Sequence, residues 1–89
     1  MQLETRDLSS FAVLAEQLHF GRAAARLHVS QPALSKRIKS LEEKIGGPLL
    51  VRNRRGVTLT PAGAMFYKES RRIIRDMDIA YEAARGRKA

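Results

Sequence analysis

The chain has 89 residues, of which 44% are hydrophobic and 29% are charged, with three prolines and six glycines. This length suits one hydrophobic core, and the composition is typical of a folded soluble domain rather than of a disordered tail. The sequence has no cysteine and only two histidines, which excludes a disulfide framework and a structural zinc site made of Cys and His ligands. We therefore expect no metal and no cofactor.

The net charge is +8, from 17 basic and nine acidic residues. Residues 1–30 carry three basic and three acidic side chains, residues 31–60 carry seven and two, and residues 61–89 carry seven and four. A domain this basic is expected to bind a polyanion, and the excess charge lies mainly in its middle third.

Neither a membrane segment nor a signal peptide is expected. No apolar run approaches the roughly 18 residues that cross a bilayer, and the N-terminus lacks the basic-then-apolar order of a signal peptide. These features predict a cytoplasmic protein without a membrane partner.

The first predicted helix follows Asp7, which is expected to cap it by accepting hydrogen bonds from free backbone amides. Four apolar residues recur at helical spacing on one face of this helix: Leu8, Phe11, Ala15 and Leu18. Gly21 then interrupts the pattern, and residues 22–27 predict a short second helix whose alanines let another helix approach closely.

A third helix is expected over residues 31–45. Ser30 is a favoured N-cap, Pro32 suits the first turn, and Gly46 suits the left-handed end of a helix. Four apolar residues share one face of this helix: Leu34, Ile38, Leu41 and Ile45. The opposite face carries Pro32, Ser35, Lys36, Lys39 and Glu43. One face is thus expected to pack and the other to bind.

Residues 49–51 and 57–59 are two short β-prone segments, joined by residues 52–56, whose Asn and Gly suit a turn. They predict a small hairpin with three arginines at its tip: Arg52, Arg54 and Arg55. Thr60 and Pro61 repeat the cap-then-proline pattern, so a helix of roughly 25 residues is expected to follow.

This last helix carries an apolar seam with the alternating spacing of a coiled coil. The seam comprises Phe66, Ser70, Ile73, Met77, Ala80 and Ala84, and it is widened by Ile74 and Tyr81. The first turns, around Met65 and Phe66, are expected to pack on the chain's own core. From Ile73 onward a second copy of the helix is the expected partner.

The order of these elements, two helices with a tight connection to a third and then a basic hairpin, indicates a helix-turn-helix followed by a wing. Residues 20–42 read FGRAAARLHVSQPALSKRIKSLE, residues 49–52 read LLVR, and residues 58–63 read TLTPAG. These segments closely resemble the N-terminal signature of LysR-type transcriptional regulators. The resemblance covers nearly the whole chain.

The resemblance implies a mostly α fold, a winged helix-turn-helix of three helices and a two-stranded β-hairpin wing, over residues 1–60. A long linker helix that forms a homodimer is implied for residues 61–86, and residues 87–89 are left as a tail. The resemblance further implies sequence-specific binding of double-stranded DNA with dyad symmetry, with helix 31–45 in the major groove and wing 52–56 at the minor groove. The effector domain that would bind a small-molecule inducer finds no room in 89 residues.

Two residues depart from the family pattern. Gly21 stands where relatives commonly have Ser or Thr, so no hydroxyl is available there to contact a phosphate, although helix-terminal amides are. Leu50 replaces a residue that is commonly aromatic, a change expected to affect packing only.

The residues expected at DNA comprise Arg22, Ser30, Gln31, Pro32, Ala33, Ser35, Lys36, Lys39, Arg52, Arg54 and Arg55. Gln31 can pair with adenine, Lys36 can reach guanine or phosphate, and Ser35 can address either. The alternative for each is an ordinary solvated side chain, and Arg52 can instead end its strand. The residues expected at the dimer interface are Phe66, Ile73, Ile74, Met77, Ala80, Tyr81 and Ala84.

No enzymatic activity is expected, because no nucleophile, base and orienting group converge in the sequence. His19 and His28 flank the second helix as turn residues, and the basic residues of the last helix alternate with acidic ones, as on a solvated face. Two other functions remain open: a nucleoid-type protein that binds DNA without sequence preference, and an adaptor whose basic patch meets an acidic protein.

Overall fold

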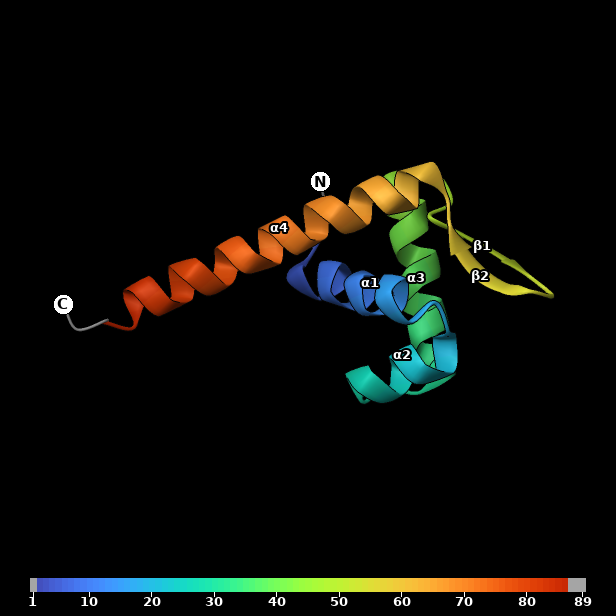
Figure 1. Cartoon of the computed structure of the whole chain (residues 1–89), viewed down its shortest axis with the longest axis horizontal. Helices are drawn as coiled ribbons and strands as arrows, with labels where there is room; N and C mark the ends of the chain where they lie inside the picture. The colour runs from blue at the N-terminus through green and yellow to red at the C-terminus, as the bar shows by residue number, and fades with distance from the viewer. Residues whose placement is uncertain (1, 87–89) are drawn as a thin grey trace.

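A computed structural model describes residues 2–86, and the expected tail, residues 87–89, lies outside them. The described residues form four helices, α1 (Thr5–Gln17), α2 (Phe20–Leu27), α3 (Gln31–Ile45) and α4 (Pro61–Ala84), and a hairpin of β1 (Leu50–Asn53) and β2 (Gly56–Leu59). The hairpin projects from one end of the molecule, whereas α4 extends past the other helices at the opposite end (Figure 1). The expected winged helix-turn-helix with a long last helix is confirmed.

The start of α1 differs from the expectation. The N-cap is Glu4, so the prediction that Asp7 caps the helix is wrong. Asp7 lies in the first turn, where its Oδ2 accepts a hydrogen bond from the backbone amide of Glu4 at 2.9 Å. A carboxylate in this turn also interacts favourably with the positive end of the helix dipole.

The helix-turn-helix follows the predicted boundaries closely. α2 begins at Phe20, so Gly21 lies inside the helix rather than before it. α3 has the expected bounds because both of its end signals are local. Ser30 Oγ accepts a hydrogen bond from the Ala33 amide at 3.1 Å, and Gly46 adopts a φ of 98°.

The core lies where α1, α2 and α3 meet. Its buried side chains include Phe11, Leu14, Phe20, Ala23, Leu34, Ile38, Leu41 and Leu49. Two residues expected to pack are exposed instead, Leu18 to 41% and Ile45 to 39%. Leu18 ends α1 in the left-handed conformation, and Ile45 lies at the last residue of α3. The core does not reach the C-terminal ends of α1 and α3, so the helical spacing predicted one packed residue too many at each of these ends.

The hairpin is antiparallel, and Leu50 pairs with Leu59 and Asn53 with Gly56. The first strand begins one residue later than expected, because Leu49 is buried in the core before the pairing starts. The Glu42 carboxylate of α3 accepts hydrogen bonds from the backbone amides of Leu49 at 2.7 Å and Leu50 at 3.2 Å. α3 thereby holds the base of the wing.

α4 crosses α1 and packs on it. The rings of Phe66 and Phe11 lie 5.4 Å apart, and Ser70 is fully buried. The backbone at Gly63 approaches the residue before β1 so closely that a Cβ there would overlap the Leu49 carbonyl oxygen. Within residues 2–86, no helix is long and apolar enough to span a membrane.

Three expectations for α4 need correction. Phe66 was expected both on the dimer seam and against the chain's own core; it packs on Phe11 of α1, so only the second expectation is confirmed. Ser70, placed on the seam by its spacing, is fully buried within the chain. Met65, expected to pack there with Phe66, is 61% exposed. Met77, for which a second copy of the helix was the expected partner, also contacts its own chain, since the Thr5 hydroxyl lies 3.9 Å from its sulfur. The reason is the direction of α1, whose N-terminal end runs back along α4.

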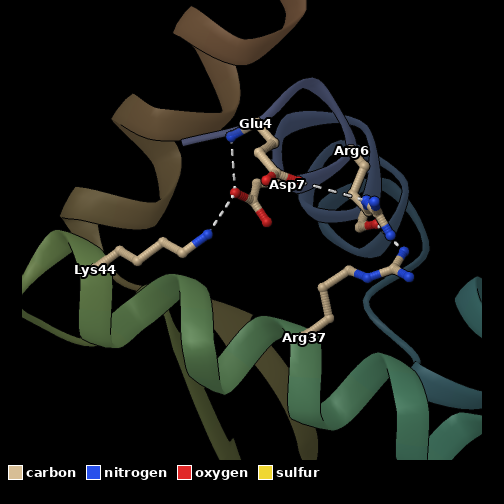
Figure 2. A network of polar contacts seen from close by, with 6 residues as sticks. Glu4, Arg6, Asp7, Arg37 and Lys44 are labelled. Carbon is tan, nitrogen blue, oxygen red and sulfur yellow. Dashed lines mark hydrogen bonds and ion pairs between the residues drawn. The ribbon is translucent and has the colours of Figure 1, made fainter. Parts of the chain in front are cut away.

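Two polar contacts fix α3 against α1, and Figure 2 shows how the side chains face one another. Lys44 Nζ lies 3.1 Å from Asp7 Oδ2, and Arg37 Nη1 donates to Ser10 Oγ at 2.9 Å. Asp7 and Ser10 are both buried. Burial by itself raises the pKa of Asp7, but the hydrogen bonds from the Glu4 amide and Lys44, with the charges of Lys44 and Arg37, outweigh it and lower the pKa below its ordinary value.

We predict that Asp7→Asn lowers the free energy of unfolding by about 1–3 kcal/mol at neutral pH, because it removes a charged hydrogen-bond acceptor from a buried site. Since the pKa of Asp7 is lowered in the folded state, its contribution is complete above the ordinary aspartate pKa of about 4 and disappears as the pH falls through the folded value. Urea unfolding at a series of pH values measures this. Asp78→Asn, which changes an exposed carboxyl group on α4, serves as the control. An Asp7→Asn protein with the parent's full acid sensitivity would contradict the assignment.

Candidate nucleic-acid interface

The outward side of α3 presents polar groups from its first turn onward. Exposed side chains on it are Gln31, Pro32, Ala33, Lys36 and Lys39, and Ser35 is half-buried. This side faces outward because the opposite one is anchored in the core by Leu34, Ile38 and Leu41, each at most 3% exposed. The division of α3 into a packing and an outward face is therefore as expected, except at Ile45.

α2, α3 and the wing form one continuous surface. A shallow groove between α3 and β1 is lined by Ser35, Lys39 and Leu50, together with Phe20 from the start of α2. On the other side of α3, Gln31 lies close to Gly21: a Cβ added at Gly21 would stand 3.6 Å from Gln31 Oε1. The three elements can thus contact one ligand together.

This surface is strongly cationic. Exposed basic side chains lie on α2, α3 and the wing: Arg22, Arg26, Lys36, Lys39, Arg52, Arg54 and Arg55. Between residues 17 and 68 the sequence has only two acidic residues, Glu42 and Glu43, and Glu42 is engaged by the wing's amides. A polyanion that approaches α3 therefore meets attraction with little repulsion. Arg26 was not singled out from the sequence, although it follows Arg22 by one helical turn and lines a separate hollow with it, beside Gln17 and His28.

Both histidines have structural roles at the ends of α2. His19 is the N-cap, and its Nδ1 accepts a hydrogen bond from the Arg22 amide at 2.9 Å. His28 ends the helix with a left-handed φ of 58°. Within residues 2–86, no three His, Asp or Glu side chains are placed to hold a metal ion.

Gly21 leaves room for the His19 cap. A Cβ at Gly21 would come within 3.0 Å of the His19 Cε1 atom, a contact tighter than side chains normally make. The His19 ring therefore occupies the space that the side chain of a Ser or Thr at position 21 would need.

The three wing arginines do not form a single group. Arg52 lies within β1, and its guanidinium carbon stands 3.9 Å from the centre of the Phe20 ring. Its Nη2 also donates to Ser35 Oγ at 3.3 Å. Arg54 and Arg55 form the tip itself, and their side chains make no ion pair or hydrogen bond to any of residues 2–86. The expectation that all three lie at the tip is wrong for Arg52, because the strand extends to Asn53.

The charged side chains at the α1–α4 crossing interact with one another. Arg71 Nη1 lies 2.8 Å from Glu16 Oε2 and 3.0 Å from the Tyr67 hydroxyl, and Arg72 pairs with Glu69 at 2.6 Å. Beyond this crossing, α4 carries exposed apolar side chains: Ile73 is 37%, Met77 45% and Tyr81 62% exposed, whereas Ile74 is half-buried. From Ile73 onward the apolar stripe is therefore mainly exposed, except at Ile74 on its edge.

Comparison with known proteins agrees with this geometry. Residues 5–64 match the family model for bacterial regulatory helix-turn-helix proteins of the lysR family. The uncharacterized HTH-type transcriptional regulator YnfL of Escherichia coli (strain K12) is 52% identical over 80 residues, which are 90% of this chain and 27% of YnfL.

Two solved structures are similar over almost their whole length. The BenM_DBD/catB site 1 DNA complex has a TM-score of 0.90 and 35% identity, covering 93% of both chains. The CbnR_DBD-DNA complex has a TM-score of 0.88 and 38% identity, covering 93% of this chain and 95% of that one. Both were solved with DNA, as their names state. The winged helix-turn-helix, its cationic outward face and these matches together establish that the chain belongs to the LysR family of bacterial regulatory helix-turn-helix proteins.

Proposed function

We propose that this chain binds double-stranded DNA sequence-specifically, with α3 in the major groove and the wing at the adjacent minor groove. The observation that carries the proposal is the outward face of α3, which is polar, exposed and flanked on both sides by cations of α2 and the wing. A major groove admits one α-helix, and base edges there present a distinct pattern for each base pair. The BenM_DBD and CbnR_DBD structures, which contain DNA, have the same fold.

Base reading is assigned to the first turns of α3. Gln31 is exposed and offers a donor and an acceptor that match adenine, while Lys36 reaches guanine or phosphate. Pro32 and Ala33 are exposed and suit apolar contact with a thymine methyl group. Ser35 lies between them and the wing, which places its hydroxyl at the same groove.

Phosphate contacts are assigned to the flanks. Arg22 and Arg26 lie on α2, Lys39 on the later part of α3, and Arg54 and Arg55 on the wing tip. Ser30 Oγ already accepts the Ala33 amide as a helix cap, so its hydroxyl is left to donate to a phosphate oxygen. These contacts would supply affinity and register but little sequence information.

Dimerisation is assigned to the uncovered stripe of α4. Ile73, Met77, Ala80, Tyr81 and Ala84 are exposed along it, and Ile74 contributes its edge. A second copy of α4 would bury this stripe, and two identical chains close most simply with two-fold symmetry. Such a dimer carries two α3 helices and requires a DNA site with dyad symmetry.

The wider assignment follows the family. We propose that residues 1–60 act as the DNA-binding unit and residues 61–86 as the dimerisation helix of a transcriptional regulator without catalytic activity, located with the nucleoid in the cytoplasm. The chain spans 27% of the length of YnfL. A small-molecule inducer would bind an effector domain outside these residues.

The test begins with selection of bound duplexes from a random pool, followed by anisotropy titrations of the selected duplex and a scrambled one. Specific binding predicts a preference of about a thousandfold or more. A protein that binds both duplexes equally, with a steep salt dependence, would instead be a nucleoid-type binder. A protein that binds neither would leave the acidic-protein adaptor as the better account.

For base reading, we predict that Gln31→Ala weakens binding to the selected duplex by about 1–3 kcal/mol and barely changes binding to scrambled DNA. The same titration of both duplexes measures the difference. Glu43→Ala, an exposed change later on α3, is the control and should not lower either affinity. Equal losses on both duplexes would remove Gln31 from base reading.

For the wing, the double variant Arg54→Ala, Arg55→Ala should weaken binding to both duplexes and reduce the slope of log affinity against log salt by about one unit for each phosphate that is deprived of its arginine. Because neither side chain has a partner among the described residues, the fold should be unaffected. Circular dichroism checks the fold. A weakened complex with an unchanged slope would indicate that the wing recognises groove shape rather than charge.

For the dimer, Ile73→Glu should raise the dissociation constant by at least about a hundredfold, because it places an unpaired carboxylate in a buried seam of each chain. Ile79→Glu is the matched control: Ile79 is 60% exposed and lies about 160° around the helix from the middle of the stripe. Ala80→Glu repeats the test at a second exposed seam position. Sedimentation measures the association. If Ile73→Glu and Ala80→Glu remain dimers as stable as Ile79→Glu, α4 is not the interface.

A further inference from the structure

Arg52 differs from the other wing arginines because its side chain turns back onto the domain. The guanidinium lies over the Phe20 ring at 3.9 Å, within the range of a cation–π interaction, and donates to Ser35 Oγ at 3.3 Å. Phe20 is the first residue of α2 and is 8% exposed, so the surface that Arg52 covers is fixed by the core. One side chain of the wing thus contacts both helices of the helix-turn-helix.

The contact restricts what the Ser35 hydroxyl can do. A guanidinium has only donors, so Ser35 Oγ must be the acceptor in this hydrogen bond. The hydroxyl proton of Ser35 then points away from Arg52, and no acceptor among residues 2–86 takes it. A cationic donor on the oxygen also makes the hydroxyl a better donor, because linked hydrogen bonds polarise one another.

We propose that Arg52 is a positioning residue that holds the wing against α3 and presents the Ser35 hydroxyl to DNA as a hydrogen-bond donor. The free proton of Ser35 therefore favours an acceptor on a base edge, such as N7 or O6 of guanine or O4 of thymine, over the amino edge of cytosine, for which only one lone pair of the hydroxyl remains. This inference rests on the proposed function, since it takes the outward side of α3 to face the bases.

The competing role for Arg52 is a direct phosphate contact, as for the arginines at the wing tip. The two roles differ in what a lysine can replace. Lysine keeps the positive charge that a phosphate attracts, but it lacks the flat guanidinium that stacks on Phe20 while donating to Ser35. Arg52→Lys should therefore disable a positioning role and spare most of a phosphate contact.

The first arm of the test uses the 89-residue chain without DNA. Double-mutant cycles in urea unfolding combine Arg52→Ala with Phe20→Leu, which keeps an apolar core residue but removes the aromatic face. We expect the shift of the unfolding midpoint in the double variant to be smaller than the sum of the single shifts. Additive shifts would overturn the stacking contact, whatever the chain does with DNA.

The second arm measures affinity for the selected duplex and for duplexes with each substitution at the base pair that Ser35→Ala identifies. Arg52→Lys should lower affinity for the selected duplex about tenfold and remove most of the discrimination at that base pair, with an unchanged salt slope. Arg75→Lys, at an exposed arginine of α4 outside the proposed DNA-binding surface, is the matched control and should keep both. In the double variant Ser35→Ala, Arg52→Lys, discrimination should be no worse than in Ser35→Ala, because Arg52 acts through Ser35.

Three results would overturn the proposal. The first is an Arg52→Lys protein that discriminates as well as the parent, and the second is a pair of independent effects from Ser35→Ala and Arg52→Lys. The third is a salt slope that falls by about one in Arg52→Ala with discrimination intact, which would identify a phosphate contact instead. If the parent itself has no sequence preference, the proposed function fails. That failure can be distinguished from a failure of the Arg52 proposal, because the unfolding cycle tests the Arg52–Phe20 contact without DNA.

Discussion

The structure depends on how α3 is buried. Leu34, Ile38 and Leu41 join Phe11 and Leu14 of α1 in one small core, and this fixes which side of α3 faces outward. Two polar contacts to buried groups of α1 set the rotation and tilt more tightly: Asp7 binds Lys44 near one end of α3, and Ser10 accepts a hydrogen bond from Arg37 near its middle (Figure 2). A helix that reads base edges must be placed within a fraction of an ångström, and a core of this size benefits from such directional contacts.

The wing depends on α3 in turn. Two strands of four residues do not form a stable hairpin by themselves in water. Here Leu49 is buried, Glu42 binds the first amides of the wing, and Arg52 lies on Phe20. Because the Glu42 and Arg52 contacts join the wing to α3 and α2, the wing and the helix-turn-helix are held together as one unit. α4 is attached to the same unit at Gly63 and Phe66, so its uncovered stripe begins at a defined distance from α3.

Local signals predicted the elements well, and long-range contacts account for the differences. Ser30, Pro32 and Gly46 lie next to the ends they define, so the bounds of α3 were predicted correctly. The roles of Asp7, Glu42 and Arg52 depend on partners 37, 7 and 17 residues away, which spacing does not reveal. Similarly, the coiled-coil spacing of α4 began at Phe66, but the crossing with α1 buries its first turns. The sequence placed the candidate DNA-binding residues on an exposed face, whereas which of them contact bases depends on the DNA itself.

The central claim, that α3 occupies a major groove and the wing the adjacent minor groove, is tested most directly by methylation protection on the selected duplex. Dimethyl sulfate modifies guanine N7 in the major groove and adenine N3 in the minor groove, so it reports on the two grooves separately. Our account predicts that the parent protects guanine N7 at two positions related by a dyad and protects adenine N3 beside each of them. In the double variant Arg54→Ala, Arg55→Ala, the adenine N3 protection should be lost while the guanine N7 protection remains. Protection confined to the minor groove, or guanine N7 reactivity equal to that of free DNA, would contradict the account.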